Sequence, residues 1–342
     1  MHSRIQRYRC SLCGKHFSAQ TFDIDYYAKR RVEYRKVVAL VGSCCGIRQM
    51  ARYLGVGYET VSNRIMRFAR QAMAMQSALI DGHSMREDLC ADGLQSYWVS
   101  QYVPNNITVL AGSRSRFIYA AIGSSLRRSG RMTEAQKRRR EVLERRFRAD
   151  PSALTRAFTE ICDTACRMIE SSERPLTVLD TDEHIAYRRA LARHGPWNQL
   201  QEARLVTHRR TNSRLPRTAS NPLAPINSID RQIRIDLAEH VRETVRFARN
   251  PNRAMERFWV WCFGYNYRKR YRINQPSGDS SRHCQVAGID RQRLNSALRS
   301  IYRTRRFMSH VRPVGSMLLV WIRMLERPFR DGCDYLPRYI YA

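Results

Sequence analysis

The chain has 342 residues, of which 43% are hydrophobic and 27% charged, which excludes an intrinsically disordered protein and permits a sizeable core. It carries 61 Lys and Arg against 30 Asp and Glu, a formal net charge of +31 at pH 7. Such an excess indicates a polyanionic partner, usually nucleic acid, an Arg-rich enzyme being the alternative. No apolar stretch of about 18 residues could span a membrane, and the basic start lacks a signal-peptide core. We therefore expect a cytoplasmic, nucleoid-associated protein that binds double-stranded DNA and no membrane.

Residues 1–20 contain two cysteines at the spacing of one zinc knuckle. Cys10 and Cys13 stand in the segment YRCSLCGKHFS, where Gly14 permits the tight turn that two thiolates on one ion need. A structural zinc takes four ligands, and His16 is a candidate for the third. Too few residues precede Cys10 to hold the second pair of a complete ribbon. We expect a partial zinc ribbon with Zn²⁺ at Cys10 and Cys13, and a pair of free thiols is the alternative.

Residues 21–80 are predicted to be helical and to include a helix-turn-helix. The first helix shows apolar residues at helical spacing, followed by a glycine suited to a helix end: Ile47, Met50, Ala51, Leu54 and Gly55. The second begins near Tyr58 and is expected to bury Val61, Ile65 and Phe68. In such motifs the second helix enters the major groove of DNA. The side chains expected to face outward and contact DNA are Tyr58, Thr60, Asn63, Arg64 and Arg67. An ordinary helical hairpin is the alternative.

Strand-like and helical runs alternate in residues 86–275, and aspartates stand at the ends of two predicted strands. Asp92 follows an apolar run, and the segments ITVLAG and RFIYAAIG after it are predicted as two more strands. Further on, an apolar strand over 176–179 leads into Asp180 and Asp182. Carboxylates on neighbouring strands can share two Mg²⁺ ions, or Mn²⁺ in their place. A helix cap or surface turn is the alternative for each aspartate, and for Asp180 in particular. The clearest linker is Thr207 to Pro225.

The order of these motifs resembles bacterial insertion-sequence transposases of the DDE/D class, over roughly residues 5–275. In both acidic blocks a tyrosine follows the aspartate by five residues, as Asp92 with Tyr97 and Asp182 with Tyr187. The segment RETVRF, followed by an aromatic helix ending in NY, matches the segment after the third acid of such enzymes. The resemblance implies an RNase H-like domain over 86–275, in which a mixed sheet is flanked by helices.

The resemblance also implies catalytic acids that hold two Mg²⁺ ions. It assigns the first acid to Asp92 and the second to Asp182, with Asp180 as the runner-up for the second. Alignment on RETVRF places Asn227 at the expected glutamate, and Asp230 stands one helical turn later. We take Asp230 as the third acid. The open alternatives are Asn227, Glu239 and Glu243.

Two further segments complete the predicted organisation. A basic insertion covers about 125–175 and contains a helix over Gly130 to Arg148, capped by Thr133 with Gln136 at the capping-box position. Its arginines are expected to lie along a DNA backbone, and a solvated helix held by Glu–Arg pairs is the alternative. Residues 276–342 are predicted to form a helical extension.

The function implied by the resemblance is a transposase that binds the ends of its element and performs Mg²⁺-dependent phosphodiester cleavage and strand transfer, as a homo-oligomer on DNA. The alternative is a catalytically inactive remnant or a site-specific DNA-binding protein. Asn227 at the expected glutamate position and the half-complete zinc ribbon favour this alternative.

Overall fold

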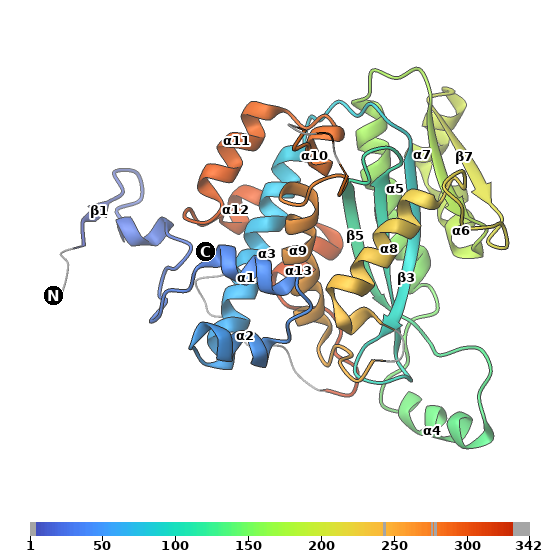
Figure 1. Ribbon diagram of the computed structural model, residues 1–342, viewed down its shortest axis with the longest axis horizontal. Coiled ribbons are helices and arrows are strands. Elements are labelled where there is room, and N and C mark those ends of the chain that lie inside the picture. The colour runs from blue at the N-terminus through green and yellow to red at the C-terminus, as the bar shows by residue number, and fades with distance from the viewer. Residues whose placement is uncertain (1–4, 242–243, 275, 277–278, 331–342) are drawn as a thin grey trace.

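The computed structural model describes residues 5–241, 244–274, 276 and 279–330, which form a mixed α/β fold around a five-stranded sheet (Figure 1). The sheet order is β5-β4-β3-β6-β7. The first three strands in sequence pair antiparallel, and the last two join the free edge of β3 in parallel. The strands are β3 (Leu89–Tyr97), β4 (Pro104–Gly112), β5 (Ile118–Ser125), β6 (Thr177–Asp182) and β7 (Val206–Thr211). The predicted mixed α/β class is confirmed.

The burial of the strands follows their position in the sheet. Every residue of β4 after Pro104 is buried, as expected for a strand with neighbours on both sides and helices over both faces. β7 is an edge strand whose sequence VTHRRT is largely exposed. The prediction of a linker beginning at Thr207 is therefore wrong for residues 207–211. Charged side chains are typical of edge strands because they discourage pairing with other chains. In β7 they obscure the apolar pattern by which a strand is predicted from sequence.

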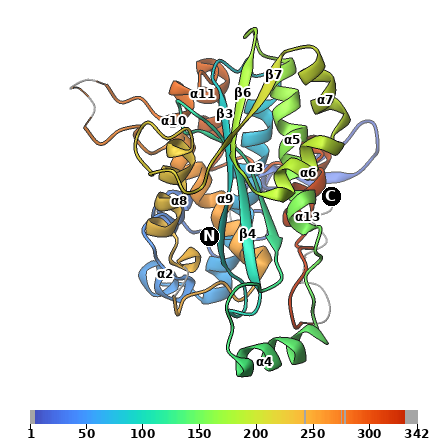
Figure 2. The same cartoon turned by 90° about the vertical axis from the view of Figure 1, so that its right-hand side faces the viewer.

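Helices cover both faces of the sheet (Figure 2). On one face, α5 (Ala153–Glu170) packs against β4 and β5, with α6 (Ile185–Arg193) and α7 (Gly195–Glu202) beside it. On the other face, α8 (Ala224–Asp236) packs against β3 and β4, and α9 (Pro251–Tyr267) lies next to β5. This arrangement places α8 directly over the strand that carries Asp92.

The N-terminal helices share one hydrophobic core with the sheet. α1 (Tyr34–Val41) and α3 (Tyr58–Ile80) pack against α9, and α2 (Ile47–Leu54) packs against α3. The aromatic residues of α9 are buried in this core, among them Phe258, Trp261 and Tyr265. A single cluster of buried side chains runs from Ile24 to Trp321.

The basic insertion forms α4 (Glu134–Glu144), which projects from the body of the molecule (Figures 1 and 2). The predicted cap is confirmed, since Thr133 Oγ1 accepts from the Gln136 amide and Gln136 Oε1 accepts from the Thr133 amide. No residue of α4 is buried. The ion pair of Arg127 with Glu144 and a hydrogen bond from Arg140 to the Arg128 carbonyl hold the helix against its preceding loop.

The chain is completed by short elements at both ends. A small hairpin, β1 (Arg7–Arg9) with β2 (His16–Ser18), stands apart from the sheet. The C-terminal part contains α10 (His283–Val286), α11 (Arg291–Ser300), α12 (Met308–Val311) and α13 (Gly315–Trp321). Two 3-10 turns are η1 (Ala19–Phe22) and η2 (Ala238–His240). Among the described residues, no helix is both long and apolar enough to cross a bilayer.

Candidate active site

The three predicted acids come from three elements that meet at one end of the sheet. Asp92 lies in β3, Asp182 ends β6, and Asp230 lies in α8. Because β3 and β6 run parallel with Cys90 opposite Asp180, the two strands carry Asp92 and Asp182 to the same level and the same face. α8 crosses over β3, and this brings Asp230 toward Asp92.

Asp92 is the electrostatic centre of this group. Its Oδ1 accepts a hydrogen bond from the Gly93 amide at 2.6 Å and one from the Tyr187 hydroxyl at 3.4 Å. Burial and the negative charge of Asp182 nevertheless raise the pKa of Asp92 to about 6. Ionisation of Asp92 beside the charged Asp182 is therefore unfavourable, and a bound cation would offset the repulsion between the two carboxylates.

Asp230 is more strongly perturbed. Burial, followed by the charge of Asp92, raises its pKa to about 8, although Arg234 and Arg217 oppose the shift. Its Oδ1 is buried and has no hydrogen-bond partner in the described part of the chain. A buried carboxylate oxygen without a partner is costly, so the position favours either a proton or a bound cation.

Tyr187 interacts electrostatically with all three acids. It stands in the first turn of α6, five residues after Asp182, and its ring stacks on Phe158 with 4.2 Å between centroids. Burial, and then the charges of Asp92, Asp182 and Asp230, raise the pKa of its hydroxyl well above the ordinary value. The hydroxyl therefore stays protonated and donates to the carboxylate of Asp92.

The acids form two neighbouring pairs that share Asp92, rather than one tight cluster. Asp92 interacts electrostatically with Asp182 and with Asp230. Within the residues that the structure describes, no three His, Cys, Asp or Glu side chains are grouped closely enough to hold one metal ion. The donor set itself, three carboxylates with one orphaned buried oxygen, fits a hard cation such as Mg²⁺ or Mn²⁺.

The alternatives for the second and third acids have other roles in the fold. Asp180 is buried and receives both guanidinium arms of Arg209 at 2.5 and 2.8 Å. Glu239 is buried and pairs with Arg257 at 2.6 Å. Asn227 lies one turn before Asp230 in α8, and Glu243 lies outside the described residues.

Arg217 is a basic residue near the acids that the sequence did not single out. Its charge lowers the pKa of both Asp92 and Asp230, and its residue is exposed. It belongs to the polar segment between β7 and α8, where no periodic pattern relates it to a site. Only the way this segment folds back past the sheet brings it close to two carboxyl groups.

The two predicted N-terminal helices are present as α2 and α3. Gly55 ends α2 with a left-handed backbone at φ 63°, and the Val56 amide donates to the Ala51 carbonyl at 3.1 Å. The side chains expected to form the apolar interface are buried or packed against the core: Ile47, Met50, Ala51, Leu54, Val61, Ile65 and Phe68.

The predicted DNA-contacting residues of α3 divide by exposure. Asn63 is exposed, and Thr60 and Tyr58 are half-buried. The Tyr58 hydroxyl accepts a hydrogen bond from Arg253 at 2.7 Å. Arg67 is half-buried and donates to the Ile24 carbonyl at 2.8 Å.

The prediction that Arg64 faces outward is wrong. Arg64 is only 3% exposed, donates to the Arg30 carbonyl and lies 3.5 Å from Asp25. The segment before α1 folds over this face of α3, so a helix that the periodicity shows as one-sided is covered on two sides. Besides Asn63 of α3, the exposed residues of the motif include Arg48, Arg52 and the 69% exposed Tyr53, all on α2.

The two N-terminal cysteines stand on a turn with the shape of a knuckle. Gly14 adopts φ +67°, and its amide donates to the Cys10 carbonyl at 2.9 Å. Hydrogen bonds from Cys13 and from the Leu12 amide lower the pKa of the Cys10 thiol. Both cysteines are free thiols, and in the described residues no third ligand joins them and no fourth.

No protein-family model matches this chain, and no curated protein sequence matches it.

Proposed function

We propose that this chain is a DDE/D-class transposase, in which an RNase H-like domain cuts and joins DNA and a helix-turn-helix with a basic arm binds it. The observation that carries the proposal is the approach of Asp182 and Asp230 to Asp92 from three separate elements, with the pKa of Asp92 and Asp230 raised. The strand order, three antiparallel strands followed by two parallel ones, agrees with the domain that the resemblance implies.

Asp92, Asp182 and Asp230 are the residues that would hold two Mg²⁺ ions. Such a pair, when bound, supplies positive charge at the attacking and departing oxygens of a phosphodiester. The chain contributes the three carboxyl groups, whose mutual repulsion favours the binding of cations. Asp230, with a pKa of about 8, keeps its proton at neutral pH until a cation takes its place.

Neighbouring residues hold the acids and the phosphate in place. The Tyr187 hydroxyl donates to Asp92 and fixes the orientation of its carboxylate. Arg217 is close enough to influence two of the acids, so it is placed to contact the phosphate under attack. The burial that raises the pKa of Asp92 and Asp230 limits the access of bulk water to these two carboxyl groups.

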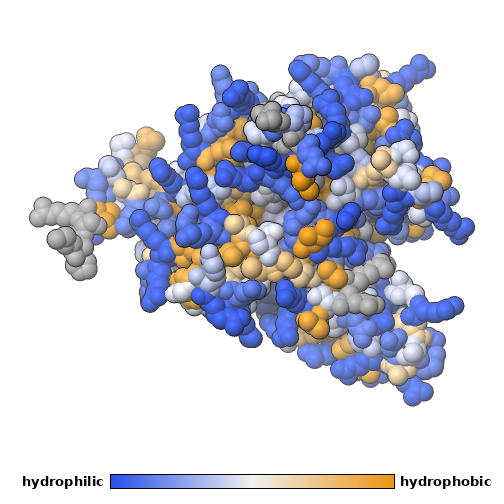
Figure 3. Space-filling model, in the orientation of Figure 1, coloured by the Kyte–Doolittle hydropathy of each residue, from blue (hydrophilic) through white to orange (hydrophobic). Residues whose placement is uncertain are grey.

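DNA binding is assigned to surfaces that remain exposed. In the motif these are Asn63 of α3 with Arg48 and Arg52 of α2, and the half-buried Tyr58, Thr60 and Arg67 of α3 lie beside them. The face of the molecule in Figure 3 is largely hydrophilic, and α4 extends from it as an arm. Its exposed arginines carry no base-reading geometry, so α4 is expected to bind the backbone without regard to sequence.

The test is DNA cleavage and strand transfer with the DNA ends that flank the gene. Asp92→Asn should abolish cleavage while leaving DNA affinity intact. Glu183→Gln is the matched control, since it removes one exposed negative charge beside Asp182 and should retain activity. Full cleavage by Asp92→Asn would disprove the assignment of the acids.

A second candidate function is sequence-specific DNA binding without cleavage. The observation that favours it is that no three ligands are grouped for one ion among the described residues. If the wild-type chain binds its element ends but cuts none of them with either Mg²⁺ or Mn²⁺, this second function is the correct one.

A further inference from the structure

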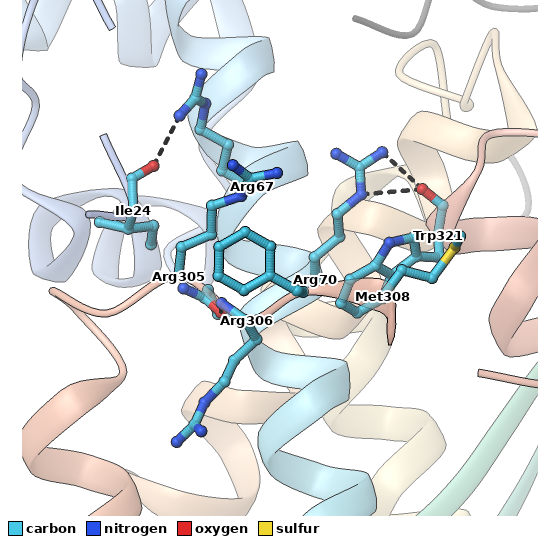
Figure 4. A pocket seen from close by; sticks show the side chains of 9 residues that line it. Ile24, Arg67, Arg70, Arg305, Arg306, Met308 and Trp321 are labelled. Carbon is cyan, nitrogen blue, oxygen red and sulfur yellow. Dashed lines mark hydrogen bonds between the residues drawn. The ribbon is translucent and has the colours of Figure 1, made fainter. Parts of the chain in front are cut away.

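The arginines of this chain divide into those that hold the fold and those that lie at the surface. Arg70 of α3 is of the first kind, because its guanidinium donates to the Trp321 carbonyl at 2.9 and 2.6 Å and ties α13 to α3 (Figure 4). A group of exposed or half-buried residues near the C-terminal end of α9 is of the second kind. This arginine cluster comes from three segments of the chain and consists of Arg114, Arg116, Arg270, Arg272 and Arg282.

Tyr271 connects three members of the arginine cluster. Its hydroxyl donates to the Arg114 carbonyl at 2.6 Å. The guanidinium of Arg116 lies 6.0 Å from the centroid of its ring, and the guanidinium of Arg272 lies 5.3 Å from it. An aromatic ring attracts a cation without cancelling its charge, so Tyr271 orders these two guanidinium groups and leaves them able to bind an anion.

The backbone brings the other two members to the same place. Arg270 and Arg282 are partners in an isolated antiparallel bridge. Next to this bridge, the Tyr271 amide donates to the Ser281 carbonyl at 3.0 Å. The pairing closes the base of the segment between α9 and α10, and it gathers all five arginines around Tyr271.

Two acids of the same region are bound by neutral donors. Asp279 accepts from the Ser281 amide at 2.8 Å. The buried Glu87 accepts from the backbone amides of Arg114 and Ser115 at 2.9 and 2.7 Å. Within the described residues, no guanidinium of the arginine cluster forms an ion pair with a carboxylate. Five like charges therefore lie together, and a polyanion would relieve their repulsion.

The arginine cluster is connected to the helix that carries Asp230. Arg116 Nη1 donates to the Ser228 hydroxyl at 3.3 Å, and Ser228 stands on α8 two residues before Asp230. Arg116 itself belongs to the turn between β4 and β5, and β4 is the neighbour of the strand that carries Asp92. A long ligand that lies along α8 at the acids can therefore extend to the arginine cluster.

We propose that the arginine cluster binds the sugar–phosphate backbone of duplex DNA without regard to base sequence. Guanidinium forks match the oxygens of phosphate groups. Tyr271 is half-buried and already in contact with two guanidinium groups, so it orders the arginines rather than stacking on a base. That the bound duplex is the one with its phosphodiester at Asp92 rests on the proposed function.

The first experiment measures the affinity of the full chain for duplex DNA over a range of salt concentrations, without divalent metal. The double variant Arg270→Gln with Arg272→Gln removes two exposed cations of the arginine cluster. It should lower the slope of log K against log salt by about 1.8, because two phosphate contacts are lost.

The matched control is the double variant Arg193→Gln with Arg204→Gln. It also removes two exposed cations, at the end of α6 and after α7, on the face of the sheet opposite α8. This control should keep the slope of the wild type. Equal slopes for the two double variants would overturn the proposal.

The second experiment repeats the salt series with a duplex of unrelated sequence and with duplex RNA. The arginine-cluster variant should lose the same slope on both DNA sequences, since backbone contacts do not depend on the bases. A loss on one DNA sequence alone, or on RNA alone, would overturn the proposal. Neither experiment needs DNA cleavage, so a chain that cuts no DNA would disprove the proposed function and leave the result for the arginine cluster unchanged.

Discussion

Replacing Asp230 by asparagine should make the metal-free protein more stable at alkaline pH. The carboxyl is buried beside Asp92, and its pKa rises from the ordinary 3.8 to about 8 on folding. A raised carboxyl pKa means that the folded state holds the proton more tightly than the unfolded chain. The stability that this proton provides is complete below about pH 4 and is lost as the pH rises toward about 8.

The magnitude follows from the size of the shift. About four units at about 1.4 kcal/mol each set a ceiling near 6 kcal/mol on the free energy lost across this range. Relaxation of the site and entry of water reduce that figure, so we expect about 2–4 kcal/mol. The asparagine side chain of the variant cannot ionise, and its similar shape keeps the packing of α8.

The assay is urea unfolding of the wild type and Asp230→Asn in the presence of a chelator, at about pH 4.5 and about pH 8.5. Asp230→Asn should be close to the wild type at the lower pH and more stable at the higher pH. Added Mg²⁺ should stabilise the wild type at the higher pH and leave Asp230→Asn less affected. Parallel pH dependences for the two proteins would refute the burial of a repelled carboxyl at Asp230.

Three other changes test separate parts of the structure. Tyr187→Phe removes a donor from Asp92 and should raise the pKa of that carboxyl, so the pH midpoint of cleavage should move upward while some cleavage remains; an unchanged midpoint would exclude a positioning role. Exchange of Arg138 and Arg139 of α4 for alanine should lower the salt slope of DNA binding by about 1.8 for any DNA sequence, and a loss confined to one sequence would contradict backbone binding. Arg64→Ala should cost about 2–4 kcal/mol of unfolding free energy, because it removes a buried side chain together with its contacts to Asp25 and to the Arg30 carbonyl; wild-type stability with weakened DNA binding would mean that Arg64 faces DNA.

Local patterns in the sequence predicted most of the regular structure near the site. Apolar spacing located α2 and α3, and the capping box located the start of α4 at Thr133. The strand that carries Asp92 could be predicted because its residues and its turn signals are local. The parallel neighbour β6 then placed Asp182 at the same level through the register of the sheet.

Features that depend on distant contacts could not be predicted in the same way. The burial of Arg64 results from a segment that folds over α3, and nothing in the helix itself signals that cover. The strand β7 was hidden because its exposed edge favours polar residues. The spacing to Tyr187 favours Asp182 over Asp180 in the sequence, and the structure adds the contact of Asp180 with Arg209 on β7. Glu239, an alternative for the third acid, is likewise paired with Arg257, and the sequence does not signal this contact.

In the proposed transposase, Asp92 shares divalent cations with Asp182 and Asp230. The most direct measurement is a crystal structure of the protein with Mn²⁺, in which anomalous scattering locates the ion. We expect anomalous density in contact with Asp92 and at least one of the other two acids, and its loss in Asp92→Asn. Density elsewhere with none at Asp92, at saturating Mn²⁺ and a pH above the pKa of Asp230, would contradict the account.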